Sequence, residues 1–161
     1  MKENTKLKWP GLEEFISGVL LMIISVAVFI QVVNRYLIGA SIPWTEELAR
    51  YSFLWITFIG VSLGVKRNSH LSVDIIKNFL GKIPNNILSL VIHLIFLIFC
   101  IVVAVIGFKV VGQMMEYGQR SPALGIEMGY VYLCVPVGLT LTSIRIVQKV
   151  ARIIRGKEKA V

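Results

Sequence analysis

The sequence contains few of the residues that carry out chemistry. Only two of its 161 residues are cysteine and two are histidine. Cys100 and Cys134 lie in separate hydrophobic runs and form no C-x-x-C pair, so we interpret them as small apolar core residues. His93 is alone in a hydrophobic run and His70 lies in a polar connection, which argues against a haem or metal site. We interpret His93 as a hydrogen-bonded contact between helices.

The sequence also lacks the common catalytic motifs. It contains no nucleophile elbow, no H-E-x-x-H, no P-loop and no G-x-G-x-x-G. No acidic residue lies in the middle of a hydrophobic run, where a proton-coupled exporter is expected to hold one. We therefore predict that the chain is not an enzyme and binds no cofactor.

Charge is scarce as well. Charged residues make up 16% of the chain, 56% of it is hydrophobic, and the mean hydropathy is +0.77. Four uncharged runs, each with its flanks, are long enough for a transmembrane helix, and in lipid only a helix satisfies its own backbone. The predicted fold class is therefore an all-α integral membrane protein, a single membrane domain over 1–161. Its four transmembrane helices are expected at about 12–36, 46–66, 87–112 and 128–150.

The net charge of +8 is distributed unevenly among the connections. Of 17 Lys and Arg, thirteen lie before the first helix, between the second and third, or at the C-terminal end. The other side has only Arg35, Arg50, Lys109 and Arg120. The positive-inside rule then places both termini of this multi-pass protein in the cytoplasm. We interpret the basic excess as a topology signal and a contact with membrane phospholipids, not with nucleic acid.

The polar connection between the second and third helices includes an amphipathic pattern at about 69–82. Leu71, Ile75 and Phe79 share one face of a helix, while Asp74 and Lys77 face elsewhere. This pattern predicts a helix that lies along the cytoplasmic surface of the membrane.

Two further patterns predict contacts. Gly60 and Gly64 form a G-x-x-x-G, a spacing that permits close approach of membrane helices. Arg145, Lys149 and Arg152 follow an i, i+4, i+7 spacing and form one basic stripe, suited to lipid headgroups or a partner.

The most informative segment is W-T-E-E-L-A-R at 44–50, directly before an uncharged run of only 15 residues. The spacing allows Arg50 to pair with Glu46 or with Glu47 on one helix face, and Arg35 is expected at a similar depth. One interpretation is an interfacial charge belt with Trp44 as an aromatic anchor. A second is an ion cluster that fixes the first helix to the second or docks another subunit. A third is direct coupling to a proton or an ion.

Several of these segments together resemble a known family. They are N-R-Y at 34–36, W-T-E-E-L-A-R-Y at 44–51, R-N-S-H-L-S-V-D at 67–74 and Y-L-C-V-P-V-G at 132–138, with Gly60 and Arg145. This set is similar to the small membrane subunit, the DctQ family, of tripartite ATP-independent periplasmic (TRAP) transporters. The W-x-E-E-x-x-R block followed by H-x-x-x-D carries most of the resemblance. It adds His70 and Asp74 to Arg35, Trp44, Glu46, Glu47 and Arg50 as candidates for a structural or partner interface.

The resemblance implies a multi-pass protein of a bacterial or archaeal inner membrane. It also implies a division of labour. A large membrane subunit carries the substrate and sodium sites, and a periplasmic substrate-binding protein delivers an organic acid. The predicted function is thus a non-catalytic small permease subunit of a sodium-coupled, binding-protein-dependent organic-acid importer. The alternative is a stand-alone small four-helix transporter or exporter that acts as a homodimer.

Overall fold

The computed structural model describes residues 11–39, 42–66 and 85–154. The described elements are α1 (Leu12–Val33), a single π-helical turn η1 (Asn34–Ile38), α2 (Pro43–Lys66), α4 (Asn85–Glu116), α5 (Met128–Tyr132) and α6 (Cys134–Ile154). Within these residues four helical stretches are long and apolar enough to cross a membrane. The predicted fold class is therefore confirmed. The segment at 69–82, with His70 and Asp74, lies outside the described residues.

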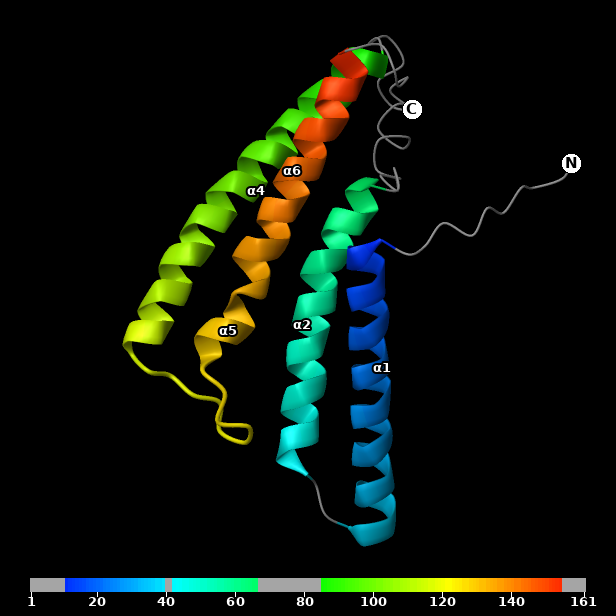
Figure 1. Ribbon diagram of the computed structural model, residues 1–161, viewed down its shortest axis with the longest axis vertical. Coiled ribbons are helices and arrows are strands. Elements are labelled where there is room, and N and C mark those ends of the chain that lie inside the picture. The colour runs from blue at the N-terminus through cyan, green and yellow to red at the C-terminus, as the bar shows by residue number, and fades with distance from the viewer. Residues whose placement is uncertain (1–10, 40–41, 67–84, 155–161) are drawn as a thin grey trace, which may run out of the picture.

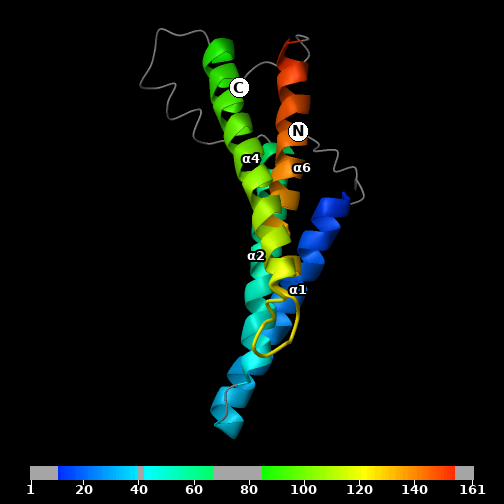
Figure 2. The same ribbon diagram turned by 90° about the vertical axis from the view of Figure 1, so that its left-hand side faces the viewer.

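The helices pack in the spatial order α1, α2, α6, α4 (Figure 1). The α4–α6 pair extends beyond α2 at one end of the bundle, and α1 with η1 extends beyond α2 at the other (Figures 1 and 2). The buried core lies mainly between α4 and α6, around Cys100, Ala104, Leu139 and Ile146, with Val65 from the end of α2. Both cysteines are buried, as the sequence analysis expects.

The outer helices expose large apolar side chains. Ala27 is the only buried residue of α1, and exposed Val, Leu, Ile and Phe side chains follow both α1 and α4. In water such surfaces would aggregate, whereas lipid or another membrane protein solvates them. Hydroxyl groups within the spans donate to the carbonyl four residues earlier, as from Ser25 to Leu21 and from Thr142 to Gly138. These hydroxyl groups are thus satisfied within their own helices.

The last span is interrupted, where we expected one helix over 128–150. The regular helix stops after Tyr132 and resumes at Cys134. Pro136 has no N–H to donate to the carbonyl of Tyr132, and its ring crowds that carbonyl. The helix continues because the N–H of Val137 donates to the carbonyl of Leu133 at 3.1 Å.

Close helix contact occurs at a glycine outside the predicted motif. A Cβ on Gly138 of α6 would lie 2.6 Å from the Cβ of Phe58 and 2.9 Å from its backbone carbonyl. The absence of a side chain at Gly138 therefore permits the close approach of α2 and α6. A Cβ on Gly60 or Gly64 would meet nothing within 4 Å. Among the described residues, the G-x-x-x-G therefore marks no helix contact.

Candidate functional site

The first turn of α2 is built by the residues that begin the W-T-E-E-L-A-R segment. Pro43 occupies the first helical position, where its missing N–H costs nothing. The side chain of Thr45 is fully buried and its hydroxyl donates to the carbonyl of Ile42 at 2.8 Å. This bond ties the first turn of α2 to the residue that precedes the helix.

The two glutamates of this turn have different environments. Glu46 pairs with Arg50 at the i, i+4 spacing, and both side chains are more than half exposed. An exposed pair of this kind contributes only a few tenths of a kcal/mol to stability. Glu47 is 8% exposed, and its carboxylate faces the rest of the bundle. Of the charged residues in this segment, Glu47 is therefore the one that contacts another part of the bundle.

The carboxylate of Glu47 accepts two hydrogen bonds from the loop at 117–127, which joins α4 to α5. The N–H of Ala123 donates to Oε1 at 3.2 Å, and the N–H of Leu124 donates to Oε2 at 3.0 Å. The spacing allowed Arg50 to pair with Glu46 or with Glu47, and the pair that forms is with Glu46. The Glu47 carboxylate is bound by two backbone amides, and hydrogen bonds to an ionised group are strong. We call this arrangement the Glu47–loop contact.

The loop presents these amides because it forms one helical turn. The N–H of Gly125 donates to the carbonyl of Ser121 at 3.1 Å, and Gly125 has a φ of +65°, the left-handed region that favours glycine. The N–H of Ser121 donates to the carbonyl of Ile126 at 2.8 Å and closes the loop. In a single turn the first amides have no internal acceptor. Those of Ala123 and Leu124 therefore remain available to Glu47.

One turn further along α2, the hydroxyl of Tyr51 lies 3.7 Å from the sulfur of Met128, the first residue of α5. This weak hydrogen bond adds a second contact between the start of α2 and the start of the last span. Together, Glu47 and Tyr51 join the first pair of helices to the second.

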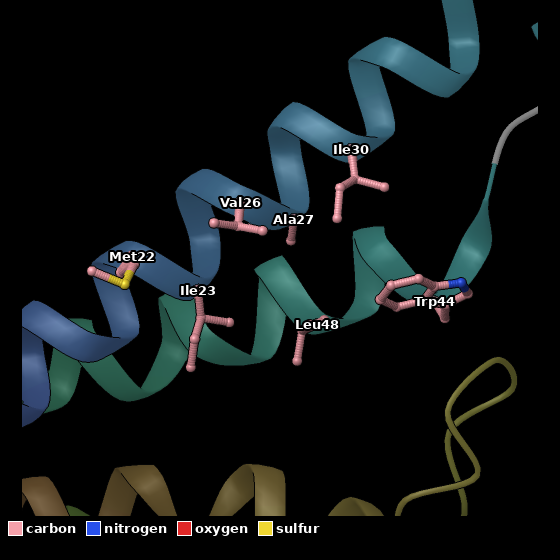
Figure 3. Close-up of a pocket in the computed structure, with 7 residues that line it drawn as sticks. All are labelled: Met22, Ile23, Val26, Ala27, Ile30, Trp44 and Leu48. Atoms are coloured by element: carbon pink, nitrogen blue, oxygen red, sulfur yellow. The ribbon is translucent and has the colours of Figure 1, made fainter.

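Arg35 and Trp44 lie apart from this contact. Arg35 is on η1, is exposed, and forms no ion pair within the described ranges. Trp44 is 41% exposed and closes an apolar groove of about 320 Å³ between α1 and α2 (Figure 3). The other lining residues are Met22, Ile23, Val26, Ala27, Ile30 and Leu48. Trp44 thus lines the surface groove between α1 and α2.

A second charged contact, which the sequence analysis missed, lies at the opposite end of the bundle. The Nη2 of Arg145 on α6 donates to the Oε1 of Glu13 on α1 at 2.9 Å. The sequence pattern predicts that Arg145 belongs to a basic stripe for lipid or a partner, and in the structure it also pairs with Glu13. The sequence did contain a signal for this pair. The predicted topology puts the start of the first helix and the end of the fourth on the same side of the membrane, so oppositely charged residues there can meet.

Two other findings limit the chemistry of the described part of the chain. No group of three or more His, Cys, Asp or Glu side chains there is arranged to hold a metal ion. His93 is buried within α4, at 3% exposure.

A family model and individual relatives of known proteins all match the chain to the same family. Residues 24–156 match the family described as the DctQ component of tripartite ATP-independent periplasmic transporters. A putative TRAP transporter small permease protein of Haemophilus influenzae is 30% identical over 144 residues, 87% of this chain and 88% of the relative. The sialic acid TRAP transporter small permease protein SiaQ of Vibrio cholerae is 27% identical over 151 residues, 90% of this chain and 83% of that protein.

A longer relative is also similar. The isethionate TRAP transporter permease protein DctMQ of Oleidesulfovibrio alaskensis is 32% identical over 117 residues, which are 73% of this chain but only 18% of that protein. The family is a transporter membrane component and not an enzyme. With its four apolar helices, the chain is a multi-pass protein of the inner membrane. The chain belongs to the DctQ component family of tripartite ATP-independent periplasmic transporters.

Proposed function

We propose that the chain is the non-catalytic small permease subunit of a sodium-coupled, binding-protein-dependent organic-acid importer, in which it supports a large membrane subunit. The observation that carries the proposal is the Glu47–loop contact. Both oxygens of this buried carboxylate are occupied by backbone amides of the same chain. A carboxylate held in this way by backbone amides of a distant loop fixes two helix pairs together, which supports a structural role for this segment.

The relatives support the transport part of this proposal. Those similar to the chain are named for isethionate, C4-dicarboxylate and sialic acid, all of them organic acids. The isethionate permease contains the matching segment within a much longer chain, which supports a large membrane subunit as the partner. We further propose a periplasmic substrate-binding protein and membrane phospholipids as partners.

For orientation we propose that both termini are cytoplasmic, from the distribution of Lys and Arg. The Glu47–loop contact then lies at the periplasmic end, with the exposed Glu46–Arg50 pair and Arg35 available for docking another subunit. The Glu13–Arg145 pair lies at the cytoplasmic end. His70 and Asp74 remain interface candidates on that side.

Reconstitution tests the subunit assignment. The chain alone in liposomes should take up no organic acid with an imposed sodium gradient. Its co-purified complex with the large permease protein encoded beside it should transport once the binding protein is added. Transport by this chain alone would overturn the proposal and favour a stand-alone homodimeric exporter.

Arg50→Ala tests the exposed pair as a docking surface. The substitution removes a cation from a pair that contributes little to the chain's own stability. We expect a lower yield of complex with the large subunit and an unchanged order of substrate preference. The matched control is Lys109→Ala, which removes an exposed cation of α4 and should leave the yield unchanged. A changed preference with full assembly would contradict the proposed role.

A further inference from the structure

A groove lies where α1 begins, at the end of the bundle that carries the Glu13–Arg145 pair. It has a volume of about 320 Å³ and is formed by α1, α2 and α6 together. Its apolar wall comes from all three helices, through Leu12, Ile16, Ile59 and Leu141. Its charged residues are Glu13 and Arg145.

The ion pair leaves hydrogen-bonding capacity on both partners. Arg145 occupies one carboxylate oxygen of Glu13, and the other oxygen, Oε2, is buried with no donor among the described residues. A buried carboxylate oxygen without a donor is costly. The Arg145 side chain is 31% exposed, and a guanidinium has five N–H groups, of which one bonds Glu13 and one lies 3.5 Å from Gln148. The groove therefore offers an acceptor for a cation beside donors for an anion.

The geometry points to a binding site for a phospholipid with a primary ammonium headgroup, of the phosphatidylethanolamine class. The ammonium donates to the carboxylate of Glu13, the phosphate accepts from Arg145, and an acyl chain lies along Leu12, Ile16 and Leu141. A quaternary ammonium has no N–H for this carboxylate, and a glycerol headgroup has no positive charge. This inference narrows the proposed contact with membrane phospholipids to one site and one lipid class.

The charge near the groove fits this occupant. Arg145 begins the stripe that continues with Lys149 and Arg152 on α6, so the phosphate enters a region of positive charge. Positive charge alone would favour an anionic lipid. The carboxylate of Glu13 opposes that preference and selects a headgroup that carries its own cation.

Native mass spectrometry of the full chain tests the site. The delipidated protein is titrated with phosphatidylethanolamine, phosphatidylcholine and phosphatidylglycerol of identical acyl chains. We expect the ethanolamine lipid to bind roughly tenfold more tightly than the others, the size of one charge-assisted hydrogen bond. Glu13→Gln should remove this preference. The control Glu46→Gln removes the same charge from the exposed pair at the other end and should keep it.

Several outcomes would overturn the inference. They are equal affinity for all three headgroups, tighter binding of the glycerol lipid, or an unchanged ethanolamine preference in Glu13→Gln. If Glu13→Gln fails to fold, Ile16→Trp fills the apolar wall and keeps the ion pair. Ethanolamine-lipid binding should then be lost, and its retention would equally overturn the site. Binding is measured on the chain alone, so its failure is distinguishable from a failure of transport in the complex.

Discussion

Removal of the Glu47 carboxylate should release the loop at 117–127. In Glu47→Ala the amides of Ala123 and Leu124 both lose their acceptor. A hydrogen bond to a charged group is worth about 1.5–3 kcal/mol. Water replaces part of this loss, because Ala123 is exposed and Leu124 is half-buried. We expect the free energy of local opening to fall by about 2 kcal/mol.

Amide hydrogen exchange of the purified chain measures this opening directly. A loss of about 2 kcal/mol corresponds to roughly 30-fold faster exchange at the two amides. Glu46→Ala is the matched control. Among the described residues the Glu46 carboxylate bonds only Arg50, so this substitution should leave both exchange rates unchanged. Exchange within about twofold of wild type in Glu47→Ala would refute the assignment of Glu47 to the loop.

Three other outcomes follow from the contacts described above. Gly138→Ala should lower the stability of the chain in detergent by about 1–3 kcal/mol, because the added Cβ would meet the α2 backbone. The control Gly60→Ala should not destabilise the chain. Equal melting temperatures for the two variants would contradict the close approach at Gly138. A double-mutant cycle of Glu13→Gln and Arg145→Gln should give a coupling energy of about 1–2 kcal/mol in thermal unfolding, and additive effects would mean that the pair is not formed in solution. A reporter fused after Val161 should read as cytoplasmic, and a periplasmic signal would reverse the proposed orientation.

Local patterns made part of this structure predictable. The uncharged runs predicted four spanning helices because lipid imposes one length and one kind of backbone on each. The Glu46–Arg50 pair followed from the i, i+4 spacing, since both residues lie on the same helix. These features depend only on residues close together in the sequence.

The decisive contacts join residues far apart in the chain. Glu47 lies 76 and 77 residues along the chain from the two amides whose hydrogen bonds it accepts. The available signal was S-P-A-L-G at 121–125, where Pro and Gly flank a short turn with free amides, but nothing in it names the acceptor. The prediction of a helix contact at the G-x-x-x-G was wrong for a related reason, because the spacing of glycines within one helix does not determine which helix packs against it. The contact fell on Gly138, whose neighbour is set by the packing of α2 against α6.

The Glu47–loop contact also has a consequence for biogenesis. During synthesis α1 and α2 emerge and insert before the ribosome has made the loop that Glu47 binds. The carboxylate must therefore wait at the water-exposed surface, and the first hairpin stays separate until the second arrives. In the proposed orientation, the contact then forms only after the loop has crossed the bilayer. A translocation error in the second hairpin would leave the Glu47 carboxylate without its amide donors, which is costly for a buried charge.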